Sequence, residues 1–255
     1  MIKNPLFKYS YYSADCVDIG RKRVSNQDQV ICCPALGFFA VSDGMGGLPG
    51  GGETSALLAK SLPAFAQEAF EELKKNATSE HAVTLLDDYI RTISDSIYET
   101  MNIGEITFGA TLCGVWLVGE HAVFFNLGDS RGYRLGRYKR RIRQITTDHN
   151  VVSMLVANGE INLDEARVHP SRNLLTRFVG MKSPSLPELF VEKINCGDGI
   201  LLCSDGLYGM VNDTLLTRIL RSSKSLNRVV RCLIEEANAA GGRDNISGVY
   251  IKMIS

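Results

Sequence analysis

Five aspartates stand where apolar stretches of the sequence begin or end. Asp28 precedes QVICC, Asp43 follows FFAVS, Asp129 follows VFFNLG, Asp205 follows ILLCS and Asp244 precedes NISGVYI. If these stretches are strands, each carboxylate is mounted at the end of a rigid element. Carboxylate oxygens are preferred ligands of hard cations such as Mg²⁺ and Mn²⁺. The pattern therefore predicts a divalent-cation site wherever the strand ends converge, a convergence that spacing alone does not establish.

Two of these aspartates, Asp43 and Asp205, are followed directly by glycine. A single Asp-Gly pair favours a simple turn, although glycine also allows the backbone to approach a ligand closely. For Asp43, Asp205 and Asp244 together the metal interpretation is favoured. Several unpaired carboxylates gathered in a fold would repel one another strongly unless cations neutralised them.

The elements that must position the aspartates are runs of strands around a pair of helices. Strand-like apolar or alternating stretches are 12–19, 29–33, 37–42, 111–118, 122–126, 132–135, 189–194, 199–204 and 246–254. Helix-like residues fill 53–75, where Pro63 is expected to kink or interrupt the helix, and 83–101. Ser225 is the expected N-cap of a later helix that ends at Gly241-Gly242. This order indicates an α+β fold with antiparallel sheets.

No linker or repeat divides the chain, so residues 1–255 are expected to form one domain, with a segment at about 150–187 lying over a site. The 28 basic and 28 acidic residues give a formal net charge of zero, which does not indicate a broad nucleic-acid or membrane surface. The apolar stretch 111–127 is too short and too interrupted to span a membrane. The N-terminus lacks the pattern of a secretion signal, so a cytoplasmic location is expected.

The seven cysteines are scattered, mostly within apolar runs, and none forms a CxxC pair. A packing role is therefore favoured over zinc binding or catalysis. His149 and His169 lie beside turns, where a structural role is favoured over catalysis.

Eight sequence blocks, in order along the chain, resemble the metal-dependent type 2C protein phosphatase (PPM) family. They are RVSNQD (23–28), AVSDGMGG (40–47), FGATL (108–112), NLGDSRGYRL (126–135), TTDHNVV (146–152), HPSRNLLTRFVG (169–180), LLCSDGLYGMV (201–211) and GGRDNISGVYI (241–251). The resemblance implies a four-layer αββα sandwich, in which two antiparallel sheets are flanked by helices, with a flap over the site.

The resemblance also implies a centre of two Mn²⁺ or Mg²⁺ ions, with a third in bacterial relatives. Asp43, Asp205 and Asp244 would hold the first ion, Asp43 and the Gly44 carbonyl the second, and Asp129 with Asp205 the third. Arg23 would clamp the phosphate, a task suited to its planar fork, and Asp28 would order a metal-bound water.

The implied reaction is hydrolysis of phosphoserine and phosphothreonine in proteins by direct attack of a metal-bridging hydroxide. The implied partners are phosphoprotein substrates and a cognate bacterial Ser/Thr kinase, and a monomer is expected. The alternative is a catalytically weak or silent relative that acts as a regulatory binding module.

Two departures from the family pattern bear on these expectations. Gln27 stands where the family has a metal-binding glutamate, which predicts a weaker second metal site because an amide brings no charge. Met45 stands where some relatives carry a histidine proposed as the general acid, which leaves the proton donor unidentified.

A basic run lies apart from these motifs. It comprises Arg134, Arg137, Lys139, Arg140, Arg141 and Arg143. A solvated hairpin is favoured, and docking of an acidic partner or phosphoprotein is the alternative.

Overall fold

Two antiparallel sheets form the centre of the computed structural model, which describes residues 1–45, 51–101, 108–182, 186–222 and 225–254. The first sheet has the order β1 (Ser10–Asp18), β11 (Ile246–Ile254), β10 (Gly199–Cys203), β7 (Arg131–Leu135) and β8 (Arg143–Gln144). The second has the order β2 (Asp28–Cys33), β3 (Phe38–Met45), β5 (Leu112–Val118), β6 (His121–Leu127) and β9 (Glu188–Lys193), and the short β4 (Gly109–Ala110) pairs with β3. The predicted α+β class with antiparallel sheets is confirmed.

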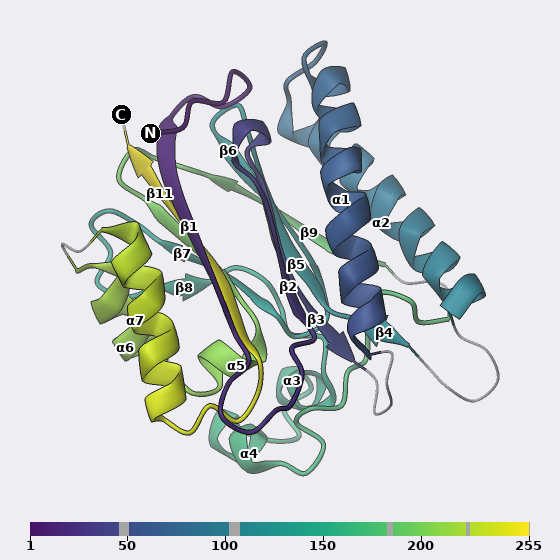
Figure 1. Ribbon diagram of the computed structural model, residues 1–255, viewed down its shortest axis with the longest axis vertical. Helices are drawn as coiled ribbons and strands as arrows, with labels where there is room; N and C mark the ends of the chain where they lie inside the picture. Colours follow the sequence, from purple (N-terminus) through teal and green to yellow (C-terminus); the bar gives the residue numbers. More distant parts are fainter. Residues whose placement is uncertain (46–50, 102–107, 183–185, 223–224, 255) are drawn as a thin grey trace.

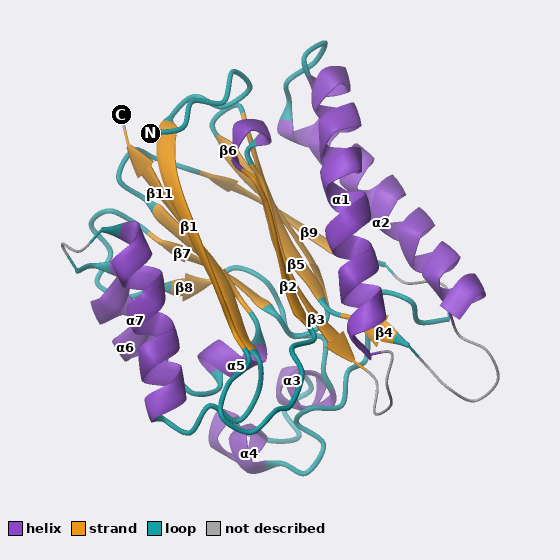
Figure 2. Ribbon diagram, viewed as in Figure 1, coloured by secondary structure: helices purple, strands orange, loops and turns teal. Residues whose placement is uncertain are grey.

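Helices cover the outer face of each sheet, so that the molecule has four layers (Figures 1 and 2). The long helices α1 (Gly51–Leu73) and α2 (Ser79–Met101) lie on the second sheet. On the first sheet lie α5 (Asp205–Tyr208), α6 (Asp213–Leu220) and α7 (Leu226–Ala239). A 3₁₀ turn at Pro34–Leu36, α3 (Val151–Ala157) and α4 (Leu163–Val168) complete the described helical elements.

Three apolar clusters hold these layers together. Phe39, Phe124 and Val249 belong to the cluster between the two sheets. Trp116 belongs to the cluster under α1 and α2, and Tyr133 to the cluster under α6 and α7. Removal of this apolar surface from water is the main stabilising contribution to the layered arrangement.

The expected interruption of the first helix at Pro63 was wrong, and the expected N-cap position of the last helix was confirmed. Helix α1 is continuous across Pro63, and the complete burial of Leu58, Leu62 and Ala66 against the sheet outweighs the hydrogen bond that proline cannot donate. Ser225 occupies the N-cap position of α7, but its side chain makes no capping hydrogen bond.

The segment expected at 150–187 contains α3 and α4 and then an irregular stretch, of which 183–185 lie outside the described residues. Within the described part of the chain, no helix is both long enough and apolar enough to cross a membrane.

Candidate metal centre

The aspartates singled out in the sequence lie at one end of both sheets. Asp28 and Asp43 are opposite each other in the β2–β3 pair. Asp205 begins α5 just beyond the end of β10, and Asp244 lies two residues before β11. Figure 1 shows the tip of β3, helix α5 and the loops leading into β2 and β11 at the same end of the molecule. The antiparallel topology therefore brings together residues that are up to 216 positions apart.

A hydrogen bond through Ser204 connects the two sheets at this end. The Ser204 hydroxyl donates to Oδ2 of Asp28 at 2.7 Å, and it accepts from the backbone N–H of Ser247 at 3.0 Å. Asp28 is only 2% exposed. One carboxylate oxygen of the second sheet is thus fixed against the first sheet.

Two other carboxylate oxygens in this region have no partner. Oδ1 of Asp28 and Oδ1 of Asp205 are both buried and accept no hydrogen bond within the described chain. A buried unsatisfied polar atom costs about 1–3 kcal/mol, and more when it carries charge. The arrangement is therefore suited to ligands that the chain itself does not supply.

The proximity of the carboxylates is seen in their pKa values. Burial raises the pKa of Asp43 well above its ordinary value, and the negative charges of Asp28 and Asp205 raise it further. Burial, with the charges of Asp129 and Asp244, likewise raises the pKa of Asp205 to about 8. Mutual repulsion of this kind is relieved by protonation or by a bound cation.

The donor atoms of these residues suit divalent cations. All of them are oxygens, two have no hydrogen-bond partner, and the negative charges of the carboxylates lie close together. No set of three or more acidic, histidine or cysteine side chains within the described residues already encloses a common point. One reason is that Asp244 is turned toward other partners. Its Oδ2 accepts from Arg23 and its Oδ1 from the Asn245 backbone N–H. Gly44 lies beside Asp43 in β3 and donates its backbone N–H to the Gln27 carbonyl at 3.1 Å.

Arg23 lies at the rim of the cluster, with its side chain 52% exposed. Its guanidinium is 2.7 Å from Oδ2 of Asp244, and this carboxylate raises the pKa of Arg23. A half-exposed guanidinium beside buried carboxylates can reach a phosphoryl group approaching from solvent.

Asn245 holds the loop that carries Arg23, a role the sequence did not predict. Its Oδ1 accepts from the Gln27 backbone N–H at 2.9 Å, and its Nδ2 donates to the carbonyls of Ile19 and Ser25 at 3.0 Å each. Thr111 was missed in the same way: its Oγ1 accepts from the Asp43 backbone N–H at 2.9 Å. Both residues lie inside the matched blocks, but nothing in their spacing indicates these bonds.

Asp129 is held by an aromatic support on α5. The Tyr208 hydroxyl donates to the Asp129 carbonyl at 2.9 Å, and the Arg131 guanidinium lies 3.6 Å from the centre of the Tyr208 ring. Arg131 also makes a bidentate bond with Asp148. Burial, with the charge of Asp148, raises the pKa of Asp129 to about 6. Asp129 thus shares the environment of Asp205, which begins the same helix.

The two histidines in the matched blocks have structural contacts. Nδ1 of His149 accepts from the Gly128 backbone N–H at 3.1 Å, and burial lowers the pKa of His149, as does Arg177. Nδ1 of His169 accepts from the Ser171 backbone N–H. These contacts support the structural role favoured for both.

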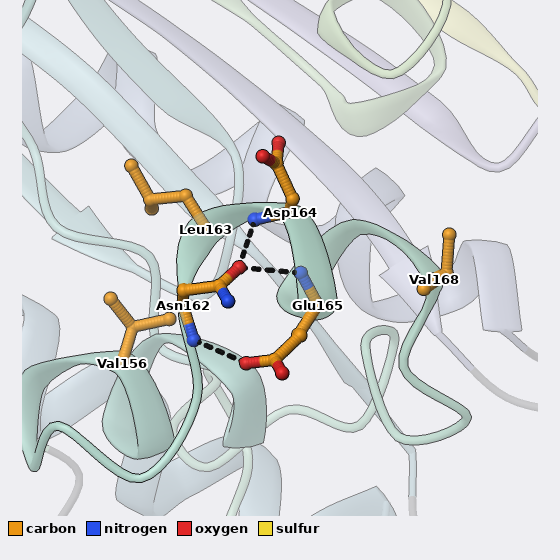
Figure 3. A pocket seen from close by; sticks show the side chains of 6 residues that line it. All are labelled: Val156, Asn162, Leu163, Asp164, Glu165 and Val168. Atoms are coloured by element: carbon orange, nitrogen blue, oxygen red, sulfur yellow. Dashed lines mark hydrogen bonds between the residues drawn. The ribbon is translucent and has the colours of Figure 1, made fainter.

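Helix α4, in the segment expected to lie over the site, is short but firmly capped (Figure 3). Asn162 accepts from the backbone N–H groups of Asp164 and Glu165, and Glu165 accepts from that of Asn162. This capping box fixes the first turn, while Leu163 and Val168 remain 69% and 78% exposed.

Comparison with known proteins agrees with this geometry. A family model described as protein phosphatase 2C matches residues 21–242. The serine/threonine phosphatase stp of Listeria monocytogenes is 34% identical over 214 residues, which cover 83% of this chain and 82% of that protein. A Streptococcus agalactiae serine/threonine phosphatase structure has a TM-score of 0.82 and 26% identity, with 95% of this chain and 99% of that chain covered. The catalytic domain of PstP, in complex with two manganese ions, has a TM-score of 0.76 and 26% identity, with 96% and 99% covered.

Proposed function

The chain belongs to the protein phosphatase 2C family, and we propose that its aspartate cluster holds the divalent cations with which it hydrolyses phosphoserine and phosphothreonine in proteins. The observation that carries this proposal is that buried Asp28 and the half-buried Asp43 and Asp205 lie within range of one another's charge, with two of their oxygens unpartnered. Such a cluster is unfavourable without a counter-charge.

We propose that the centre holds two Mn²⁺ or Mg²⁺ ions, in line with the PstP structure that contains two manganese ions. Asp43, Asp205 and Asp244 would hold the first ion, and Asp43 with the Gly44 carbonyl the second. Asp129 and Asp205 would hold a third. Bound cations would make water a nucleophile at neutral pH and offset the charge of the phosphoryl oxygens.

The chain's own residues then supply position and charge. Asp28 has one oxygen fixed by Ser204, so its other oxygen is left to orient the attacking water. Arg23 exchanges its bond with Asp244 for a bidentate bond with the phosphoryl group once the carboxylate is engaged elsewhere. In this scheme no side chain acts as the nucleophile, which agrees with the burial of Cys16, Cys113 and Cys203.

Residues 1–255 are proposed to act as one phosphatase domain, since the first and last strands pair along their whole length. We further propose a cytoplasmic monomer that opposes a cognate bacterial Ser/Thr kinase. The alternative of a silent regulatory module, suggested by Gln27 alone, finds no support among relatives named as phosphatases.

The direct test is hydrolysis of an aryl phosphate and of a phosphothreonine peptide, with Mn²⁺ and after chelation. Both substrates should turn over with Mn²⁺, lose turnover on chelation and regain it when Mn²⁺ is restored. Asp43→Ala and Asp205→Ala are the inactive controls. The absence of metal-dependent turnover of either substrate, in a chain that still melts cooperatively, would overturn the proposal.

A further inference from the structure

The turn between β7 and β8 carries the basic run noted in the sequence, and the structure divides that run into two groups. Arg134 and Arg143 form ion pairs with acidic side chains. Arg134 binds Asp198 at 2.7 Å and Glu192 at 2.9 Å, and Arg143 binds Glu192 at 2.7 Å. These two arginines secure the base of the hairpin to Glu192 in β9 of the second sheet and to Asp198, the residue before β10.

The other four basic side chains project from the turn. Arg137, Lys139, Arg140 and Arg141 are all exposed, and within the described residues none of them pairs with an acidic group. With the six cations of the run set against Asp198 and Glu192, the formal charge of this region is +4, although the whole chain is neutral. The hairpin is therefore a concentrated positive patch.

The surroundings of the turn add to this potential. The Arg221 guanidinium donates to the carbonyls of Gly136 and Arg137, and the Lys252 ammonium donates to the Gly197 carbonyl at 2.6 Å. Burial lowers the pKa of Lys252, Asp198 opposes that shift, and Arg221 and Arg137 add to it. These side chains bring further positive charge without any added carboxylate.

The patch is also concave. The hairpin lines a hollow of about 890 Å³ together with Asn195, Cys196 and Asp198, whose carboxylate is already paired with Arg134. At its edge the Tyr138 side chain is 84% exposed, with the Arg137 guanidinium 5.2 Å from its ring centre. A hollow lined by arginines and an exposed aromatic ring suits a segment of polypeptide with carboxylate side chains, since arginine binds carboxylates in a planar fork.

Two other anionic partners fit less well. Nucleic-acid binding gains its affinity from many phosphate contacts, about 6–10 in strongly salt-dependent binders, whereas four free cations occupy this one turn. A bilayer presents a flat surface, and a polybasic membrane signal uses clusters of about four to eight cations beside an apolar anchor.

We propose that the exposed basic turn Arg137–Arg141 is a docking surface for an acidic segment of the phosphoprotein substrate, separate from the phosphorylated residue. This inference rests on the phosphatase function proposed above. A cluster of Asp or Glu at a distance from the phosphoresidue would then distinguish one phosphoprotein substrate from another.

The fold sets a minimum distance between the phosphoresidue and the acidic segment. Asp129 lies two residues before β7, at the metal-centre end, and the basic turn follows the other end of that strand. A strand of five residues separates its ends by about 13 Å, at about 3.3 Å per residue. The acidic segment must therefore lie at least about four residues, in extended conformation, from the phosphoresidue.

The test uses three synthetic phosphothreonine peptides. The first has six glutamates starting eight residues from the phosphothreonine, the second has six glutamines there, and the third has the glutamates directly adjacent. The variant is Lys139→Glu/Arg140→Glu/Arg141→Glu. A matched control, Lys60→Glu/Lys75→Glu/Arg231→Glu, makes the same charge change on exposed faces of α1, its following turn and α7.

For the hairpin variant, KM for the first peptide should rise about tenfold, with kcat and the aryl-phosphate kinetics unchanged within twofold. The glutamine peptide and the adjacent-glutamate peptide should change less than twofold, and the control variant should match the wild type. The preference for the first peptide should also fall as NaCl is raised to 0.5 M, because salt screens exposed charges.

The proposal is overturned if KM for the first peptide is unchanged in the hairpin variant, or if the control variant raises it equally. It is also overturned if the hairpin variant loses binding to vesicles with anionic lipid, or to single-stranded DNA, while its peptide kinetics stay unchanged. If the wild-type enzyme turns over all three peptides with equal KM, the docking proposal alone is refuted. If it shows no Mn²⁺-dependent turnover of any peptide, the proposed phosphatase function itself is refuted.

Discussion

The Ser204 hydroxyl donates a 2.7 Å hydrogen bond to Oδ2 of Asp28, and so joins the two sheets at the aspartate cluster. Ser204 also accepts from the Ser247 backbone N–H at 3.0 Å, so the position of its oxygen is fixed by a bond to each sheet. Asp28 is therefore held by one oxygen, while its second oxygen has no hydrogen-bond partner within the described residues. The proposed orientation of water depends on this bond.

Replacement of Ser204 tests that dependence. Ser204→Ala removes the 2.7 Å hydroxyl bond from a buried carboxylate, so the free energy of unfolding should fall by about 1–3 kcal/mol. We expect kcat for an aryl phosphate to drop about tenfold or more with little change in KM, because water is misplaced while phosphate binding is retained. Ser204→Thr, which keeps the hydroxyl, should recover most of kcat. Equal losses in both variants would contradict the assigned role.

The predicted weak affinity of the second metal site depends on Gln27. Its side chain packs beside Gly52 at the start of α1, and Gln27 directly precedes Asp28 in the chain. Gln27→Glu adds a carboxylate, and Mn²⁺ titration calorimetry should show the weaker site tightened about tenfold. Gln67→Glu, an exposed change on α1, is the control for net charge. Unchanged affinity in Gln27→Glu would refute the prediction.

We expect Arg23 to contribute to substrate binding more than to metal binding. Arg23→Lys keeps the charge but loses the planar fork, so KM for an aryl phosphate should rise about tenfold, while Mn²⁺ affinity should stay the same or increase because Asp244 loses its guanidinium partner. Arg21→Lys, two residues earlier, is the control. A loss of Mn²⁺ binding without a rise in KM would assign Arg23 a structural role instead.

Glu192 gives a pH-dependent contribution to stability. Burial acts to raise its pKa, but the bonds with Arg143 and Arg134 outweigh burial and hold the pKa below the ordinary value of 4.5. The folded state thus favours the ionised form, so this stabilisation is present above the ordinary pKa and is lost as pH falls through the lowered one. Glu192→Gln should lower the free energy of unfolding by about 1 kcal/mol at pH 7. In denaturant melts the difference should vanish at the acid end, and a constant difference at all pH values would contradict this origin.

Much of the fold followed from patterns along the chain. Alternation and apolar runs placed every described strand of five or more residues, because side chains that face a core at every second position, or on both faces, leave a clear signal. The five aspartates at strand ends were found in the same way. The short helices α3, α4, α5 and α6 were not predicted individually, since elements of four to eight residues carry too few turns for a periodic signal.

The hydrogen bonds that support the site could not be predicted from the sequence, for a different reason. Ser204 and Asp28 are 176 residues apart, and Asn245 contacts Ile19 across 226 residues. Such bonds depend on how one sheet packs on the other, which spacing does not determine. The basic run was visible in the sequence, but only the structure separates Arg134 and Arg143, which are paired within the fold, from the four cations that project.

The most direct test of the account is Mn²⁺ titration calorimetry on the wild-type chain and Asp205→Asn, with Asp88→Asn, an exposed change on α2, as the control. The wild type and the control should bind at least two Mn²⁺ ions per chain. Asp205→Asn should lose at least one of them, together with about a thousandfold or more of aryl-phosphate turnover. If Asp205→Asn binds Mn²⁺ with the same number of sites and the same affinity as the wild type, the aspartate cluster is not the metal centre.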